Sequence, residues 1–244
     1  MRVFSCLAIA FLCWLMGLPA TAQDQPAGRV LLASGHLDSV VTLPLFFRLY
    51  RAHLPAAQQA SYQGSNAMLY DLSGASTIQV EGGAARPFAE GAGAFVAAGQ
   101  EVTISAAESE PTDLLVFLLT ARPNQGRRLL SRPAIAQELL RTPDPLPGLK
   151  EGPYEFSLVR VTFPPGMHTD PPHYRSGAAL DYVLAGTGTL SADGKTEAGS
   201  AGMALFEAFG WVHSLANPGE TPLILLQANI TRVGEPAVVP APAK

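Results

Sequence analysis

The sequence predicts an all-β protein with two tandem antiparallel β-barrels joined by a linker that contains a short helix. The first observation is the density of turn residues, since 23 Gly and 21 Pro are spread over 244 residues. The second is that the apolar segments between these turns are short and rich in Val, Leu, Ile, Phe and Thr. Many short strands at close spacing are typical of a sandwich or barrel. A hydrophobic content of 48% with 15% charged residues indicates a well-buried globular protein.

The N-terminal segment, residues 1–22, has the pattern of a secretory signal peptide. Arg2 is followed by an apolar run from Val3 to Leu18 and then by the small residues Ala20 to Ala22. The run is about 16 residues long, shorter than the ~20 residues that a membrane-spanning helix needs. We therefore expect cleavage after Ala22, an exported chain that is periplasmic or secreted, and no stable membrane insertion after cleavage. An uncleaved N-terminal anchor is the alternative.

The remaining composition narrows the function further. Both cysteines, Cys6 and Cys13, lie in the expected signal peptide, so the mature chain from Gln23 has neither disulfides nor a thiol nucleophile. The formal net charge is −4, and no basic run or basic cluster beside aromatic residues is present. Nucleic acid is therefore not an expected partner. Gly-rich phosphate loops and G-x-S-x-G nucleophile motifs are also absent from the sequence.

The rest of the chain divides into five segments. The linker carries the predicted helix, from Pro133 to Arg141, because proline suits the first helical turn and Pro143 ends the run. In the second barrel, residues 159–163 alternate as in a half-buried strand, and residues 223–228 are apolar as in a buried one. The five segments are a lead-in at 23–44, the first barrel at 45–121, the linker at 122–150, the second barrel at 151–233 and a Pro/Ala-rich tail at 234–244.

An internal repeat with a period of about 110 residues supports the two barrels. Its four matches occur in the same order in both halves of the chain, which indicates two copies of one β domain. The matches pair residues 47–55 with 156–164, residues 69–74 with 181–186, Gly99 with Gly210, and the strand at 114–119 with the segment from 223 onward.

The second copy contains two motifs that resemble those of the cupin family, G-x5-H-x-H-x3,4-E-x6-G and G-x5-P-x-G-x2-H-x3-N. The first motif fits from His173 to Gly186, although Gly166 is one residue too far upstream. The second fits in its spacing throughout, with Ala208 where proline is usual. This resemblance covers roughly residues 45–232 and implies a bicupin, two small jelly-roll-like barrels in one chain, with a possible homodimer. The matching residues are His173, Tyr174, Arg175, Ala179, Gly186, Gly202, Gly210, His213 and Asn217.

The resemblance also implies a metal site, but this sequence departs from its pattern. Cupins commonly hold a divalent metal through the two His and the Glu of the first motif and the His of the second. His173 and His213 match the first and last of these positions, whereas Arg175 and Ala179 replace the other His and the Glu. A guanidinium cannot ligate a cation and opposes one placed nearby.

Two hypotheses for the site remain open. A rebuilt metal site would use His168, His173, Asp181 and His213 as ligands for Fe, Mn, Ni, Cu or Zn, because Asp181 shares strand parity with Ala179. Alternatively, Arg175 pairs with Asp181 or stays available for a carboxylate or phosphate ligand. The second hypothesis is the one we favour.

These hypotheses lead to three functions. The favoured one is a metal-free binding site for a small anionic molecule, formed by His173, Arg175, Asp181 and His213 in the second barrel. The others are a metal-dependent enzyme resembling cupin dioxygenases, isomerases or decarboxylases, and a non-catalytic scaffold. The first barrel is expected to be structural, since the position that matches His213 is near Val102 and no histidine occurs in residues 62–67.

Overall fold

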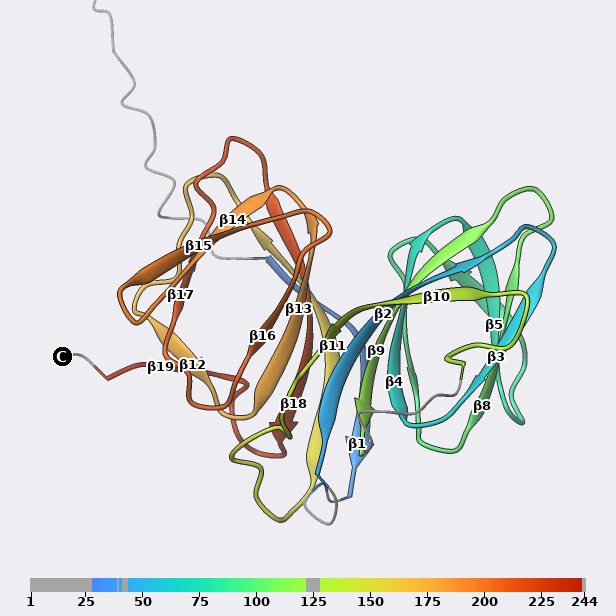
Figure 1. Ribbon diagram of the computed structural model, residues 1–244, viewed down its shortest axis with the longest axis horizontal. Helices are drawn as coiled ribbons and strands as arrows, with labels where there is room; N and C mark the ends of the chain where they lie inside the picture. Colours follow the sequence, from blue (N-terminus) through green and yellow to red (C-terminus); the bar gives the residue numbers. More distant parts are fainter. Residues whose placement is uncertain (1–27, 39, 41–43, 122–127, 243–244) are drawn as a thin grey trace, which may run out of the picture.

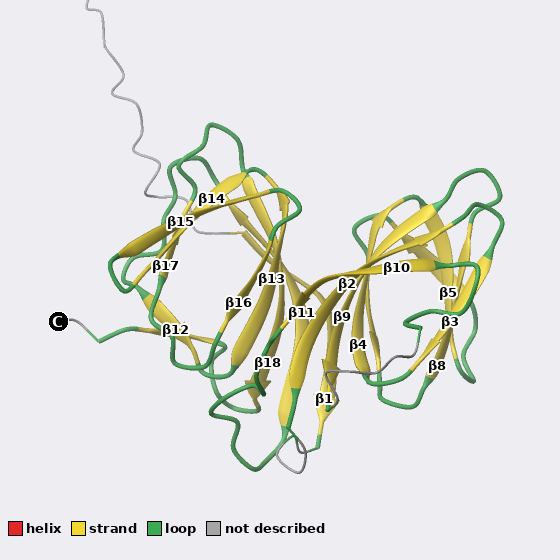
Figure 2. Cartoon of the chain, viewed as in Figure 1, coloured by secondary structure: helices red, strands yellow, loops and turns green. Residues whose placement is uncertain are grey.

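The computed structural model describes residues 28–38, 40, 44–121 and 128–242. Every regular element in these ranges is a β-strand. The strands pair antiparallel and form two barrels that lie side by side (Figures 1 and 2). The described part of the chain contains no helix, so none that could cross a membrane. The expected signal peptide and its cleavage site lie outside the described residues.

The first barrel consists of a five-stranded sheet, ordered β10-β2-β9-β4-β7, and a four-stranded sheet, ordered β3-β8-β5-β6. Its strands are β2 (Phe46–Leu54), β3 (Gln59–Gln63), β4 (Asn66–Ser73), β5 (Ala75–Val80), β6 (Arg86–Ala89), β7 (Gly93–Val96), β8 (Glu101–Ala106), β9 (Thr112–Thr120) and β10 (Ile135–Arg141).

The second barrel repeats this plan with a five-stranded sheet, ordered β1-β11-β18-β13-β16, opposite a three-stranded sheet, β15-β14-β17, and a two-stranded one, β12-β19. Its strands are β1 (Gly28–Leu37), β11 (Tyr154–Phe163), β12 (His173–Arg175), β13 (Ala178–Ala185), β14 (Thr187–Ala192), β15 (Lys195–Ser200), β16 (Ala204–Glu207), β17 (Ser214–Ala216), β18 (Leu223–Arg232) and β19 (Val238–Pro240).

The repeat is visible in the register of these sheets. Leu69 on β4 lies opposite Val116 on β9, and the matching Asp181 on β13 lies opposite Gln227 on β18. The two five-stranded sheets therefore have equivalent strands in the same order. This equivalence allows each position of one barrel to be compared with a position of the other.

The two barrels exchange their outer strands. β1 precedes the first barrel in sequence but pairs with β11 of the second barrel. β10 follows the first barrel and pairs back onto β2. The expected lead-in therefore contributes a strand to the second barrel, and the expected tail contributes β19, which pairs with β12.

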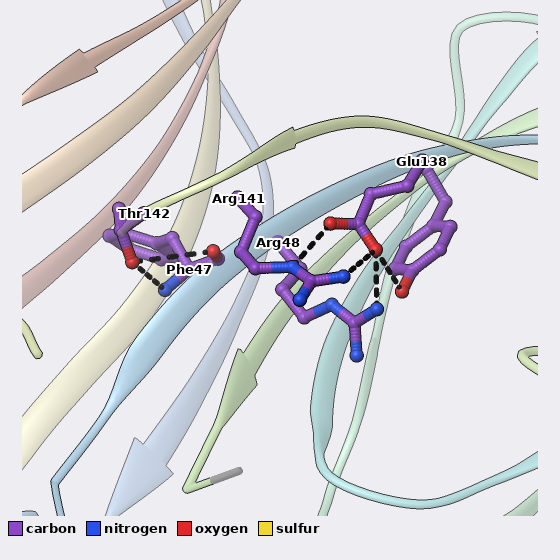
Figure 3. Close-up of polar contacts among 6 residues, drawn as sticks. Phe47, Arg48, Glu138, Arg141 and Thr142 are labelled. Carbon is purple, nitrogen blue, oxygen red and sulfur yellow. Dashed lines mark hydrogen bonds and ion pairs between the residues drawn. The ribbon is translucent and has the colours of Figure 1, made fainter. Parts of the chain in front are cut away.

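The helix predicted from Pro133 to Arg141 was wrong, because residues 135–141 form β10. The open edge of β2 supplies backbone partners for this segment, and such tertiary pairing overrides local propensity. Side chains reinforce the pairing, as Figure 3 shows: Glu138 accepts hydrogen bonds from Arg48 and Arg141. Just after the strand, the Thr142 hydroxyl oxygen accepts one from the Phe47 backbone at 3.1 Å.

Three apolar clusters hold the molecule together. The largest lies between the two five-stranded sheets, where Phe156 of β11 contacts Phe47 of β2 and Phe95 of β7 with ring centroids 6.1 and 6.4 Å apart. A second cluster fills the interior of the first barrel. The third, in the second barrel, has fewer buried members, because polar side chains occupy part of that interior.

Candidate binding site in the second barrel

Four buried side chains that the sequence motifs singled out enter the second barrel from different elements. β12 supplies His173 and Arg175, β13 supplies Asp181, and the segment between β16 and β17 supplies His213. His173 and His213 face each other across an isolated bridge, in which each backbone N–H donates to the other's carbonyl at 2.8 and 2.9 Å. Their ring centroids are 4.5 Å apart.

A fifth buried residue, Glu207 on β16, connects this group. Its carboxylate forms an ion pair with Arg175 Nε, and its Oε1 lies 3.1 Å from His213 Nε2. Arg175 and Glu207 are 2% and 1% exposed, so the pair is removed from water. The Nδ1 atom of His213 is 2.9 Å from the Trp211 carbonyl, and the Trp211 indole stacks on the His213 ring at 5.0 Å.

Sequence reasoning missed Glu207 because it lies one residue before the motif position held by Ala208. On β16 it is the direct partner of Ala179, the position where the family motif has its Glu. A carboxylate is thus supplied from the neighbouring strand in place of the missing one. The feature of the sequence that could have identified it is a glutamate directly after the apolar run Ala204–Phe206, within the same strand.

The structure corrects the predicted partner of Arg175. The sequence suggested an ion pair with Asp181, whereas the ion pair of Arg175 is with Glu207. Asp181 does face the interior, as its strand parity predicted, and its Oδ2 accepts a hydrogen bond from Gln227 at 3.3 Å. Its Oδ1 is buried without a hydrogen-bond partner, as is Arg175 Nη1.

Burial and neighbouring charges shift the pKa values of Asp181, Glu207 and His173 in different directions. Burial, followed by the nearby Glu207 carboxylate, raises the pKa of Asp181 well above its usual range and favours the protonated acid. Burial opposes ionisation of Glu207 too, but Arg175 and His213 outweigh it and lower its pKa. Burial, then His213 and Arg175, lower the pKa of His173 to about 4, so this ring is neutral near pH 7.

A cavity of about 310 Å³ opens onto this group. Its wall includes His173, Arg175 and Glu207, and also Arg29 from the exchanged strand β1. The Arg29 guanidinium donates to Gln227 Oε1 at 3.3 Å, so its hydrogen-bond partner is a neutral amide. Burial, followed by the neighbouring Arg175, lowers the pKa of Arg29.

The rim of the cavity is formed by loops and by the C-terminal strand. His168 and Asp170 line it as exposed residues. Val238 and Pro240 of β19 line it on the side where that strand pairs with β12. His168 is therefore at the mouth of the cavity rather than in the buried group around Glu207.

The residues present do not fit the divalent metal that the family motif implies. Within the described ranges, no group of three or more His, Asp, Glu or Cys side chains is placed to hold a metal ion. The proposed ligand set of His168, His173, Asp181 and His213 is thus not gathered around one point. The Glu207 carboxylate, which could otherwise ligate a metal, forms an ion pair with the Arg175 guanidinium. The positive charge of Arg175 also repels a metal cation placed nearby.

The equivalent positions of the first barrel carry no such group. The register of β3 and β8 places Tyr62 opposite Val102, as His173 lies opposite His213. Val96 lies opposite Ala67 on β4, as Glu207 lies opposite Ala179. A tyrosine and two valines therefore replace both histidines and the glutamate, and Leu69 replaces Asp181.

Comparisons with known proteins agree with this architecture. Residues 159–228 match the cupin domain model. AerE from Microcystis aeruginosa superposes with a TM-score of 0.56 at 13% identity, covering 83% of this chain and 99% of that chain. Oxalate decarboxylase from Bacillus subtilis, in a structure concerned with its Mn(II) centres, superposes with a TM-score of 0.51 at 14% identity, covering 91% and 82%.

No curated protein matches the sequence significantly. At identities this low, the similarity to solved structures concerns the fold alone. The matched domain coincides with the second barrel, and the two-barrel fold extends over nearly the whole described chain. Residues 159–228 therefore match a cupin domain, within an all-β chain whose two antiparallel barrels have the fold of these solved structures.

Proposed function

We propose that the second barrel binds a small anionic molecule, through a carboxylate or phosphate group, without the metal usual in the family. The observation that carries this proposal is the buried Arg175 guanidinium, whose Nη1 has no hydrogen-bond partner and which lines a cavity of about 310 Å³. A buried donor without a partner costs about 1–3 kcal/mol, and a ligand oxygen at this atom recovers that cost. Charge-assisted bonds from arginine are also geometrically suited to carboxylates and phosphates.

Arg29 supports the same function because it lines the same cavity and adds a second guanidinium to it. The hydrogen-bond partner of Arg29 is the neutral Gln227 amide, whereas Glu207 forms its ion pairs with Arg175 and His213. Cavities of a few hundred cubic ångströms with a few convergent polar groups are typical of small-molecule sites. We further propose that the protein acts outside the cytoplasm after residues 1–22 are removed.

The test measures binding of acetate, malonate and inorganic phosphate by calorimetry at constant ionic strength. Removing Arg175 alone would leave Glu207 as an unpaired buried charge, which typically destabilises a protein by about 3–5 kcal/mol. The informative variant is therefore Arg175→Met/Glu207→Gln, for which we expect affinity to fall at least tenfold. Arg29→Gln should weaken binding severalfold while leaving the fold intact, because the Arg29 side chain is only partly buried and bonds a neutral amide.

Arg86→Gln is the matched control, since Arg86 is an exposed arginine on β6 of the other barrel. Unchanged affinity in the double variant would rule out the anion site. Elemental analysis of chain purified without chelator addresses the alternative function. Close to one metal per chain, lost in His173→Ala and His213→Ala, would replace this proposal with a metal-dependent enzyme.

A further inference from the structure

A second polar cavity, of about 90 Å³, lies at one end of the first barrel. A cavity of this size has room for several water molecules or for one compact ion. Arg48 and Tyr50 of β2, Tyr62 of β3 and Thr120 of β9 contribute to its wall, together with Arg128. On β2, Phe47 and Leu49 pack in the cluster between the two five-stranded sheets. Because side chains alternate along a strand, Arg48 and Tyr50 point to the interior of the first barrel.

Among the residues that the structure describes, two guanidinium groups and no carboxylate line this cavity. Arg48 is only 7% exposed, yet its Nε has no hydrogen-bond partner. Buried arginine donors are normally satisfied, so an unpaired one on a side chain that lines a cavity points to a missing acceptor. Arg128 is exposed, and it places a second positive charge at the same cavity.

The carboxylate that Arg48 contacts, Glu138, does not line the cavity, and both of its oxygens already accept hydrogen bonds. Figure 3 shows Arg48 and Arg141 converging on it from two strands. Tyr50 also donates its hydroxyl to Glu138 at 2.8 Å. Although burial opposes it, hydrogen bonds from Arg141, Arg48 and Tyr50 lower the pKa of Glu138 to about 2, so it carries one negative charge shared by two arginines.

We propose that this cavity binds a compact oxyanion, such as phosphate or a small carboxylate, between Arg48 and Arg128. The oxyanion accepts a hydrogen bond from Arg48 Nε and lies next to the positive charge of Arg128. The site uses no residue of the second barrel, so it stands or falls separately from the function proposed above. It also lies in the barrel whose sequence predicted only a structural role.

The test follows the arginine Nε–H signals of ¹⁵N-arginine-labelled chain during titration with phosphate and, separately, with acetate. The Arg48 signal is identified by its loss in Arg48→Lys, which keeps a cation for Glu138. We expect this signal to shift and saturate with phosphate or acetate, but not with chloride at equal ionic strength. Comparing the two titrations shows whether a tetrahedral or a planar oxyanion is preferred.

Arg128→Gln should weaken the affinity read from the Arg48 signal at least fivefold, because it removes one of two cations from an exposed position where folding is unaffected. Arg86→Gln, on the same barrel but away from the cavity, should change it less than twofold. Arg29→Gln should leave it unchanged while weakening the second-barrel site. An Arg48 signal that follows ionic strength alone, or an affinity indifferent to Arg128→Gln, would overturn the proposal.

Discussion

Glu207 shows how one residue changes the chemistry available to a barrel. The family motif expects a glutamate at the position of Ala179, and the structure instead provides one from the strand directly opposite. Because Arg175 enters the same space, this carboxylate forms an internal ion pair. A buried ion pair contributes little net stability compared with apolar packing. This ion pair lines the cavity of the anion-binding site that we propose.

Asp71 on β4 is another buried carboxyl, in addition to Glu207 and Asp181. It is fully buried, its Oδ2 accepts a hydrogen bond from the Ser76 hydroxyl at 3.0 Å, and its Oδ1 has no partner. Burial raises the pKa of Asp71 from 3.8 to about 6. The folded state thus favours the protonated acid, so this residue's contribution to stability is full below pH 3.8 and is lost as the pH rises through 6.

We predict that the free energy of unfolding of Asp71→Asn, relative to wild type, is about 1–2 kcal/mol more favourable at pH 8 than at pH 4. The reason is that the amide cannot ionise in the buried site, whereas the wild-type carboxyl does. Urea unfolding at both pH values measures the difference. Asp113→Asn is the control with the opposite sign, since ion pairs with Arg51 and His53 lower the pKa of Asp113 despite its partial burial. Equal pH dependence in wild type and Asp71→Asn would contradict this prediction.

At the scale of elements, the same turn closes equivalent strands in both barrels. Gly74 follows β4 and Gly186 follows β13, with φ angles of 98° and 80°. A Cβ added at these positions would lie 2.2 Å from the Pro111 carbonyl oxygen and 2.5 Å from that of Pro222. Both turns therefore need glycine for two reasons, the left-handed backbone and the close approach of another segment.

Gly186→Ala is predicted to lower the free energy of unfolding by about 3 kcal/mol, since it combines backbone strain with a backbone clash. Gly202→Ala separates the two effects, because Gly202 also has a positive φ, 90°, but nothing lies within 4 Å of an added Cβ. That variant should lose only about 1 kcal/mol. Denaturant unfolding of both variants tests this, and equal losses would show that the clash with Pro222 is relieved at no cost.

The strand exchange gives each barrel an element from outside its own stretch of sequence. β1 brings Arg29 to the cavity of the second barrel, and β10 brings Glu138 to the arginines of the first. Each candidate site therefore depends on a strand from outside the sequence segment of its own barrel. Unfolding or removal of that strand would disturb the site even if the rest of the barrel stayed folded.

At the scale of the whole molecule, the largest apolar cluster belongs to neither barrel alone. It lies between the two five-stranded sheets and includes Phe47, Phe95 and Phe156. Separating the barrels would expose this cluster to water and detach β1 and β10 from their partners. Exposing apolar surface costs about 25 cal/mol per Å², so the two barrels should unfold together.

We predict that a cavity made in the first barrel destabilises the second. Ile104→Ala, inside the first barrel, should lower stability by about 2–5 kcal/mol. Trp211 is the only tryptophan from Gln23 onward and lies in the second barrel, so its fluorescence reports on that barrel alone. Its unfolding midpoint should move with the far-ultraviolet circular dichroism of the whole chain. A Trp211 midpoint that stays at the wild-type value would mean that the barrels unfold independently.

The sequence by itself determined the all-β class, the duplication and the inward placement of His173, Arg175, Asp181 and His213. Turn residues, strand alternation and motif spacing are local features, so they can be read along the chain. The repeat also indicated which barrel carries the polar interior, since Tyr62 and Val102 stand where the other copy has histidines.

Only the tertiary structure decided which partners these residues meet. Glu207 meets Arg175 because the segment that follows β16 bridges to β12 at Phe209, and Arg29 reaches the same cavity because β1 crosses to β11. Residues 135–141 became a strand because the edge of β2 was open to them. Pairing between segments that are distant in the sequence is set by the free energy of the assembled sheets, and no local pattern in the sequence carries that information.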